Sequence, residues 1–301
     1  MEMYPLHQTR REMLAIVSAP LATRQAGYRP VLAVQFYIWT QHFQSRKISL
    51  AEGVEEAFAA TRRAGYKQVE LMAAFFTPDL REKTIKALRQ HSLELPVVYN
   101  GGPMHEAAGA EKSIVATVEL AEVVKAAGAS VIDFNPNPKP KRERKSDEEL
   151  ATQARYVNQL GAELQRRGMR LILHHHDPEM ADNAREWRHL VAKTDPRLVS
   201  FCVDVHWVYR GGQDPLTLLR EAGSRLVELH LRNSKQGAWT EAFEKGDIDY
   251  SKVADYLRRT RFAGFLVVEL AYEKSSAVTR SLEEDLRLSR VFAEKVFRVR
   301  S

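Results

Sequence analysis

Histidine and carboxylate side chains gather at the ends of four apolar runs in the second half of the chain. Five of the ten histidines lie there, together with two acids and an arginine: His174, His175, His176, Asp204, His206, His230, Arg232 and Glu269. Neutral imidazoles and carboxylates are the ligands that manganese, cobalt, zinc and iron bind in proteins, and carboxylates also bind magnesium. Cys202 is the only cysteine, which excludes a cysteine-rich zinc site and an internal disulfide. The pattern therefore predicts a divalent metal site built from histidine, aspartate and glutamate.

The spacing within each run limits which of these groups share a site. Successive side chains of a strand point to opposite faces, so His174 and His176 share a face while His175 points away. By the same rule, Asp204 and His206 share a face. An alternative interpretation stays open, in which the buried imidazoles only close the strand ends through hydrogen bonds.

The elements that position these groups alternate regularly from residue 30 onward. Eight short apolar runs have the composition of strands buried on both faces, and they cover residues 31–37, 68–71, 95–99, 130–134, 170–174, 199–203, 226–231 and 265–270. Amphipathic segments predict helices at residues 50–64, 79–91, 111–127, 147–167, 181–194, 215–222, 251–259 and 279–297. Ser146 and Glu149 form a capping box, and Gly65, Gly128 and Gly168 occupy helix C-cap positions.

Strict alternation of eight strands and eight helices predicts an α/β fold, a single-domain (β/α)₈ TIM barrel over residues 30–301. A doubly wound open sheet usually carries a glycine-rich loop after its first strand, and residues 34–40 contain no glycine. Active sites of such barrels form at the carboxyl ends of the strands, where the first four predicted strands also end in polar or aromatic side chains. These side chains are Gln35, Tyr37, Trp39, Glu70, Tyr99, Asn100, His105, Asn135, Asn137 and Lys139.

Length and composition agree with a globular protein. The chain has 301 residues, of which 44% are hydrophobic and 28% are charged, and no apolar run approaches the roughly 20 residues of a membrane-spanning helix. The net charge of +6 arises from 45 basic and 39 acidic residues and gives little support to a nucleic-acid partner. We therefore expect neither a nucleic acid nor a membrane as partner. The basic run at 139–145 is interpreted as a solvated loop or a phosphate contact, and a homo-oligomer stays open.

Residues 1–29 lie outside the predicted barrel. They contain the pair Arg10-Arg11 followed by small apolar residues, which resembles a twin-arginine export signal. The apolar stretch is short and Pro20 interrupts it, so an ordinary leading arm is equally compatible with the sequence. An exported and a cytoplasmic location both stay open.

Several short motifs resemble one family when their order and spacing are considered together. They are residues 171–177 (Leu-Ile-Leu-His-His-His-Asp), 202–207 (Cys-Val-Asp-Val-His-Trp), 211–214 (Gly-Gly-Gln-Asp), 228–233 (Glu-Leu-His-Leu-Arg-Asn), 246–250 (Gly-Asp-Ile-Asp-Tyr) and 267–270 (Val-Val-Glu-Leu). From about residue 31 onward, the chain resembles the xylose isomerase-like TIM barrels. Within them it is most similar to the sugar phosphate isomerase/epimerase group, which includes ketose 3-epimerases and inosose dehydratases.

The resemblance implies one metal ligand at each of the last four strand ends. The residues that match the sixth, seventh and eighth positions are Asp204, His230 and Glu269. Relatives usually carry glutamate at the fifth position, where this chain offers His174, with His176 as a competing choice on the same face. A second departure is Asn233, where relatives usually carry aspartate.

The activity implied by the resemblance is that of a divalent-metal-dependent isomerase or epimerase. Such an enzyme acts on a sugar or sugar-like keto or polyol substrate by removing the proton next to a carbonyl, and Glu269 would serve as acid or base. A histidine in place of the second carboxylate leaves a dehydratase or eliminase of a keto-inositol or keto-sugar as the alternative, with His176 or Glu179 as the base. The expected substrate-binding side chains are Tyr37, Trp39, Glu70, Asn135, Lys139, His206 and Arg232.

Two other classes of function stay open. The same superfamily contains DNA repair enzymes of the AP endonuclease type, which need a trinuclear zinc cluster. The early strand ends of this chain offer only Glu70 and His105 for such a cluster. A sugar-binding barrel without catalysis would differ by lacking metal-dependent turnover. In the favoured interpretation the partner is a small carbohydrate.

Overall fold

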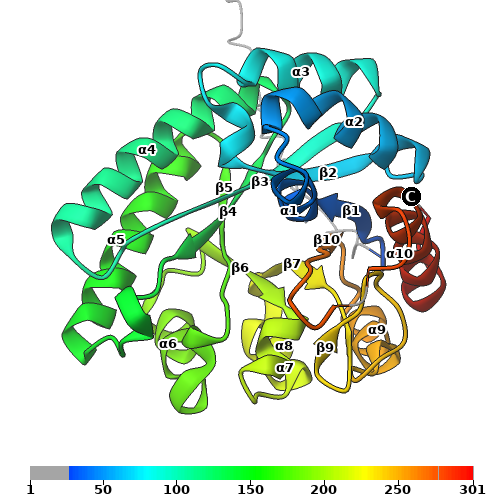
Figure 1. Cartoon of the computed structure of the whole chain (residues 1–301). Helices are drawn as coiled ribbons and strands as arrows, with labels where there is room; N and C mark the ends of the chain where they lie inside the picture. The colour runs from blue at the N-terminus through cyan, green and yellow to red at the C-terminus, as the bar shows by residue number, and fades with distance from the viewer. Residues whose placement is uncertain (1–26, 277, 301) are drawn as a thin grey trace, which may run out of the picture.

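Eight parallel strands close into a barrel in the computed structural model, which describes residues 27–276 and 278–300. The barrel order is β1-β10-β7-β6-β5-β4-β3-β2, so the first and last of these strands lie side by side (Figure 1). The strands are β1 (Val31–Gln35), β2 (Gln68–Met72), β3 (Glu94–Gly102), β4 (Val131–Pro136), β5 (Arg170–Leu173), β6 (Val199–Asp204), β7 (Leu226–Leu231) and β10 (Phe265–Val268). The predicted TIM barrel is confirmed, whereas the predicted export signal falls in residues outside the described ranges.

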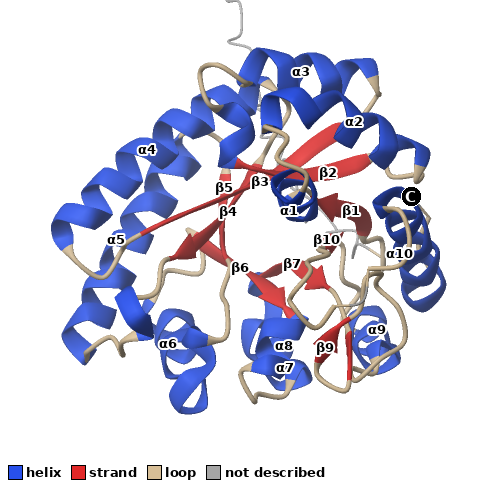
Figure 2. Cartoon of the chain, in the orientation of Figure 1, coloured by secondary structure: helices blue, strands red, loops and turns tan. Residues whose placement is uncertain are grey.

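Helices surround the barrel and cover the outer face of its strands (Figure 2). They are α1 (Tyr37–Ser45), α2 (Leu50–Arg63), α3 (Arg81–Gln90), α4 (Ala107–Ala126), α5 (Asp147–Arg166), α6 (Ala181–Lys193), α7 (Val205–Arg210), α8 (Pro215–Ala222), α9 (Tyr250–Arg259) and α10 (Leu282–Phe297). Short 3₁₀ turns are η1 (Ala73–Phe76), η2 (Pro140–Arg142), η3 (Pro178–Met180) and η4 (Gly223–Arg225). The strands β8 (Ser234–Lys235) and β9 (Ala238–Trp239) pair as a separate antiparallel hairpin.

Local sequence signals determine several helix ends. The hydroxyl of Ser146 accepts a hydrogen bond from the backbone N–H of Glu149 at 3.1 Å, and the Glu149 carboxylate accepts one from the N–H of Ser146 at 2.7 Å. This is the predicted capping box at the start of α5. Gly65, Gly128 and Gly168 follow helix ends with φ of +98°, +108° and +71°, a conformation that L side chains rarely adopt.

The register of the strands brings polar residues of neighbouring strands to the same height. Asp204 on β6 pairs with His230 on β7, and His230 pairs with Val267 on β10. Glu269 follows Val267 by two residues and therefore lies one step nearer the carboxyl end of the barrel. These three strands thus present their polar side chains side by side.

A small apolar cluster lies inside the barrel, separate from the larger core between strands and helices. It consists of Val97, Val131, Ile172, Cys202 and Val227. Cys202 is fully buried there, and burial raises the pKa of its thiol well above the ordinary value. Polar residues occupy the interior closer to the carboxyl ends of the strands.

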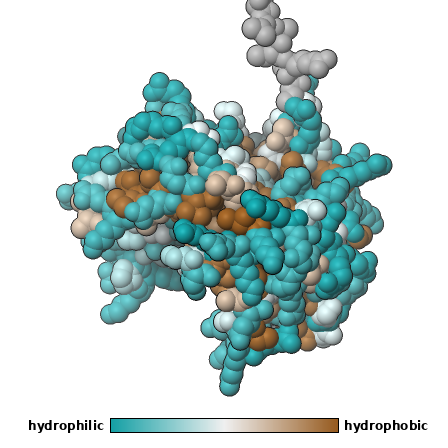
Figure 3. Space-filling view, turned by 90° about the horizontal axis from the view of Figure 1, so that it is seen from above, coloured by the Kyte–Doolittle hydropathy of each residue, from teal (hydrophilic) through white to brown (hydrophobic). Residues whose placement is uncertain are grey.

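None of the helices in the described part of the chain is long and apolar enough to cross a membrane. The face in Figure 3 is mostly hydrophilic, with hydrophobic residues gathered in a band across its middle. Large exposed hydrophobic side chains among the described residues are Tyr37, Val115, Tyr209, Val278 and Val291. Scattered apolar side chains of this kind are normal on a folded domain.

The first strand is shorter than the sequence predicts. The Gln35 side-chain oxygen accepts a hydrogen bond from the N–H of Tyr37 at 2.7 Å, and the chain turns directly into α1. Trp39 therefore lies on a helix, where its indole N–H donates to Thr61 Oγ1 of α2 at 3.1 Å and its ring stacks on Phe43. This placement corrects the expectation that Trp39 ends a strand, and the polar edge of its ring faces α2.

A side-chain cap also ends the sixth strand. Asp204 Oδ1 accepts hydrogen bonds from the N–H groups of His206 and Trp207 at 2.9 and 2.8 Å, so α7 begins directly after β6. His206 thus occupies the first turn of a helix. The expectation that it shares a strand face with Asp204 is corrected for the same reason.

Asn233 anchors the loop between β7 and α9. Its amide nitrogen donates to the carbonyl oxygens of Glu244 and Ile248 at 2.9 and 3.1 Å. Its side-chain oxygen accepts hydrogen bonds from the N–H groups of Ser234 and Ile248 at 3.0 and 3.1 Å. An aspartate can accept but cannot donate, so these contacts explain why the chain carries asparagine here.

The Trp39–Thr61 hydrogen bond generates a stability prediction. Trp39→Phe and Thr61→Val each leave one buried polar group unpaired, so each is expected to lower the free energy of unfolding by about 1–3 kcal/mol. The double variant removes both partners and is expected to lose less than the sum of the two single losses. Urea unfolding followed by circular dichroism measures all three. Additive losses would contradict the contact.

Asn233→Asp is expected to lower the free energy of unfolding by about 3 kcal/mol, because two buried carbonyl oxygens would then face a carboxylate. The control is Asn158→Asp, a partly exposed amide that donates one hydrogen bond of 3.3 Å, with an expected loss below about 1 kcal/mol. Equal losses in the two variants, measured by thermal or urea unfolding, would refute the role assigned to Asn233.

Candidate metal and substrate site

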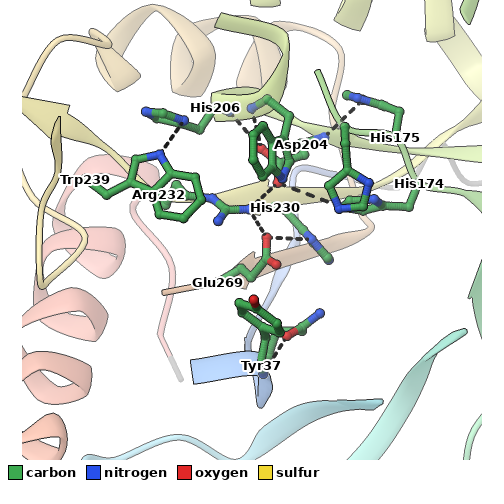
Figure 4. Close-up of polar contacts among 12 residues, drawn as sticks. Tyr37, His174, His175, Asp204, His206, His230, Arg232, Trp239 and Glu269 are labelled. Carbon is green, nitrogen blue, oxygen red and sulfur yellow. Dashed lines mark hydrogen bonds and ion pairs between the residues drawn. The ribbon is translucent and has the colours of Figure 1, made fainter. Parts of the chain in front are cut away.

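Four side chains from neighbouring strands converge at the carboxyl end of the barrel (Figure 4). They are His174, immediately after β5; Asp204, the last residue of β6; His230, within β7; and Glu269, immediately after β10. One possible ligand atom of each lies within 4.8 Å of those of the other three. At most 7% of any of these residues is exposed. The fold therefore brings together the four residues that the sequence places at separate strand ends.

The His174 ring has no hydrogen-bond partner at either nitrogen among the described residues, although only 3% of the residue is exposed. Such buried polar atoms nearly always have a partner in folded proteins. Burial and the neighbouring His176 lower the pKa of His174 well below the ordinary value, so the ring is neutral and keeps a free lone pair. Two imidazoles and two carboxylates with an unsatisfied ring among them fit a divalent metal ion.

Arg232 lies across the same group. Its Nη2 donates to Asp204 Oδ2 at 2.7 Å and also to Glu269 Oε2. Its guanidinium carbon lies 5.2 Å from the ring centre of Trp207 and 4.7 Å from that of Trp239, which are cation–π distances. Burial alone would raise the pKa of Glu269, but Arg232 and a hydrogen bond from the neighbouring histidine outweigh it and lower this pKa to about 2. Glu269 is therefore ionised at neutral pH.

The two ring nitrogens of His230 face different sets of acids. Nδ1 lies 3.2 Å from Glu269 Oε2, whereas Nε2 lies 2.9 Å from Glu70 Oε2 and 3.2 Å from Glu228 Oε1. Asp133 Oδ2 is 3.7 Å from the same Nε2. Burial raises the pKa of Glu70 to about 8, with His230 opposing this rise and Glu228 adding to it. Glu70 thus lies beneath His230 rather than at the barrel opening.

Sequence reasoning from strand ends misses Asp133 and Glu228. Both lie in the middle of an apolar run, two residues before a polar group that the same reasoning selects. The signal was the alternation itself: Glu228, His230 and Arg232 share one face of β7 and its extension, as Asp133 and Asn135 do on β4. On β4 and β7 the inward face therefore carries one acid below the residue that the sequence selects.

The histidines next to His174 have different surroundings. His175 points away from the site, where its Nε2 accepts a hydrogen bond from the N–H of Asp204 at 3.3 Å and its ring packs against Trp187. His176 faces the site, with its ring centre 4.8 Å from that of His174 and 5.3 Å from that of Trp207. Burial lowers the pKa of His176, although Glu269 opposes this shift.

Glu179 folds back over the turn that follows β5. Its Oε2 accepts a hydrogen bond from the N–H of His176 at 2.9 Å, and its Oε1 has no partner in the described part of the chain. Burial and the nearby Glu186 raise the pKa of Glu179 to about 7. The side chain is thus oriented by the backbone of the turn, next to His176.

His206 belongs to a chain of hydrogen bonds that runs to the β8–β9 hairpin. Its Nδ1 accepts from the indole N–H of Trp239 at 3.2 Å, which leaves Nε2 to donate to Ser234 Oγ at 3.0 Å. The Ser234 hydroxyl donates in turn to Asp247 Oδ2 at 2.7 Å. Burial and Arg232 lower the pKa of His206 to about 4. His206 is therefore a neutral ring that holds Trp239 against Arg232.

Three further residues expected to contact a substrate have separate environments. Tyr37 begins α1, and 37% of it is exposed. Asn135, the last residue but one of β4, is almost fully buried, and its Oδ1 has no hydrogen-bond partner among the residues described. Lys139 forms an ion pair with Glu149 of α5 at 2.7 Å.

Four of the five basic side chains in the run at 139–145 form ion pairs with acids of α5, of α6 and of the loop after β5. Its other ion pairs include Arg142 with Asp177 at 2.5 Å, Arg144 with Asp182 at 2.9 Å and Lys145 with Glu186 at 2.6 Å. These pairs favour the interpretation of the run as a structural loop over that of a phosphate contact.

Comparison with known proteins agrees with the barrel fold. Residues 58–291 match the family model described as the xylose isomerase-like TIM barrel. An inosose dehydratase of Clostridium perfringens is 28% identical over 168 residues, which cover 50% of this chain and 56% of that protein. The matched segment thus spans only about half the length of this curated relative.

Two solved structures share the fold across nearly the whole chain. A sugar phosphate isomerase/epimerase from Parabacteroides distasonis superposes with a TM-score of 0.68 and 16% identity, covering 94% of this chain and 98% of that one. A D-psicose 3-epimerase from Clostridium cellulolyticum, solved with D-tagatose, gives a TM-score of 0.70 and 14% identity, covering 89% and 99%. The family match, the motifs and the closed barrel of this chain all agree. The chain belongs to the xylose isomerase-like TIM barrel family.

Proposed function

We propose that this chain is a divalent-metal-dependent isomerase or epimerase that acts on a sugar or sugar-like keto or polyol substrate. The observation that carries the proposal is the buried group of His174, Asp204, His230 and Glu269 at the carboxyl ends of the barrel strands. This is where TIM-barrel enzymes carry out their chemistry. The similarity to proteins named as epimerases and inosose dehydratases supports the same class of reaction, the removal of a proton next to a carbonyl.

The proposed metal ligands are His174, Asp204, His230 and Glu269, with His176 as the competing choice for the fifth strand. A divalent metal held there would supply a Lewis acid for the carbonyl and hydroxyl oxygens of a substrate. The donor set is compatible with manganese, cobalt, zinc, iron or magnesium. Asp204 meets a further requirement, because its second oxygen is fixed by the start of α7 and the side chain cannot turn away from the barrel axis.

Glu269 is the proposed proton acceptor. Arg232 and His230 keep its carboxylate ionised at neutral pH, which is the form that a general base requires. Arg232 carries a permanent positive charge into a dry environment between Trp207 and Trp239. A fixed charge of this kind stabilises the negative charge that develops on a substrate oxygen when the neighbouring carbon loses its proton.

His176 is the proposed partner of Glu269 in proton transfer. Its neutral ring faces the site beside His174 and Trp207, and a neutral imidazole both accepts and returns a proton. Glu179 is the alternative base, because its raised pKa of about 7 lies close to the operating pH of an acid–base group. Tyr37, Asn135 and Lys139 are proposed substrate contacts. Glu70 and His206 are proposed to act indirectly, because they hold His230 and Trp239.

A dehydratase or eliminase acting on a keto-inositol or keto-sugar is the second candidate. One specific observation favours it: the fifth strand offers imidazoles where a second carboxylate would make the acid–base pair symmetric. An imidazole opposite a carboxylate suits removal of a proton followed by loss of a hydroxyl group as water. The similarity to an inosose dehydratase supports this candidate as well.

Metal dependence is tested by removal and by substitution. Dialysis against a chelator is expected to abolish turnover, and added Mn²⁺ or Co²⁺ to restore it. Asp204→Asn keeps the cap of α7 and is expected to lose the metal of this site, measured by elemental analysis. Glu269→Gln is expected to lower kcat by about 10²–10⁴-fold. The control is Glu119→Gln on the exposed face of α4. Full activity of the metal-free wild type would refute the proposal.

The reaction is assigned by proton NMR in D₂O with a panel of ketoses, inososes and 3-keto-glycosides. An isomerase or epimerase is expected to place deuterium next to the carbonyl while every hydroxyl group is kept. A dehydratase is expected to release water and form an unsaturated or diketo product. Sugars that raise the melting temperature without exchange or turnover would point instead to a sugar-binding barrel without catalysis.

A further inference from the structure

A second group of acids lies deeper in the barrel, beneath the candidate metal site. It consists of Glu70 on β2, Asp133 on β4 and Glu228 on β7, all with 0% exposure. One oxygen of each and one ring nitrogen of His230 lie within 4.8 Å of one another. We call these three carboxylates the deep acids. None of them has a direct role in the reaction proposed above, where Glu70 only holds His230.

The deep acids have too few hydrogen-bond donors. His230 Nε2 is within reach of Glu70 Oε2 and Glu228 Oε1, at 2.9 and 3.2 Å, but one ring nitrogen carries at most one hydrogen. The other four oxygens have no hydrogen-bond partner among the described residues: Glu70 Oε1, Glu228 Oε2 and both oxygens of Asp133. Unpaired buried carboxylates are expensive, because they lose their hydration and gain nothing in return.

The charges of the barrel interior do not balance either. Five buried carboxylates lie within it: Glu70, Asp133, Asp204, Glu228 and Glu269. Arg232 offsets one negative charge, and of these five acids it contacts only Asp204 and Glu269, the upper acids. A divalent ion among the upper ligands would offset two more when His230 binds it as a neutral ring. Two negative charges then remain on the deep acids, and a second divalent ion would balance them.

We propose that Glu70, Asp133 and Glu228 hold a second divalent cation beneath the first, of the hard class that prefers oxygen ligands. His230 separates the two positions, because its Nδ1 faces Glu269 and its Nε2 faces the deep acids. Ligand atoms on opposite sides of an ion are about 4.2 Å apart for Mg²⁺ and about 4.8 Å for Ca²⁺, so the span of the group suits this class. The cation takes the place of the missing donors, and the carboxylates that hold it accept the Nε2–H of His230.

The competing explanation is that the deep acids carry protons instead of an ion. Burial and the neighbouring Glu228 raise the pKa of Asp133 well above its ordinary value when no cation is present. The two explanations differ in what they predict for metal binding, since a protonated cluster binds no ion. Mn²⁺ is the suitable probe, because electron paramagnetic resonance counts the free ion directly.

The experiment measures the number of Mn²⁺ ions bound per chain. The wild type is expected to bind two, Asp133→Asn and Asp204→Asn one each, and the exposed control Glu119→Gln two. One ion in the wild type that persists in Asp133→Asn and is lost in Asp204→Asn would overturn the proposal and leave the upper site intact. One ion lost in Asp133→Asn and kept in Asp204→Asn would support the deep site and refute the upper one. No bound ion in the wild type would overturn both.

A second measurement excludes a simple folding defect. Metal-free Asp133→Asn is expected to melt at or above the temperature of the metal-free wild type, because the amide is neutral without a proton, whereas the buried carboxyl must stay charged or take one up. Added Mn²⁺ is expected to raise the melting temperature of the wild type more than that of the variant. Glu228→Gln is the second variant and is expected to behave alike. Equal increases in the wild type and both variants would overturn the proposal.

Discussion

The buried ion pairs of Arg232 with Asp204 and Glu269 join the carboxyl ends of three barrel strands. A charge taken out of water costs several kcal/mol unless a partner of opposite charge and good geometry meets it. One guanidinium provides that partner for two carboxylates, and Trp207 and Trp239 shield it from solvent. Asp204 also begins α7 through its other oxygen, so the start of a helix depends on the same side chain. The acids of the site are tolerable inside the barrel because this cation is present.

Most of the fold was predictable from the sequence because its signals are local or periodic. Strands that are buried on both faces form continuous apolar runs, and a serine followed three residues later by glutamate starts a helix wherever it stands. The meeting of His174, Asp204, His230 and Glu269 was predictable too, since the carboxyl ends of parallel strands come together whatever their exact register. None of this required knowledge of side-chain contacts.

The remaining features depend on single contacts and on depth. Gln35 and Asp204 end their strands by accepting backbone hydrogen bonds. The hydrophobic periodicity of the sequence does not reveal such a cap. Trp39 and His206 were therefore assigned to strand ends, although both lie on helices. Alternation shows that Asp133 faces inward but not how far below the mouth it lies. That depth follows from the stagger of neighbouring strands, which is a property of the closed barrel and not of any one segment.

Cys202, enclosed in the apolar cluster of the barrel interior, gives the chain an internal reporter of opening. Its thiol is fully buried and kept protonated by burial, so a thiol reagent reacts with it only in molecules whose strands have separated. The reaction rate therefore measures the free energy of opening of the barrel itself, apart from fraying of the peripheral helices. Because the chain contains one cysteine, the signal comes from a single position without any added label.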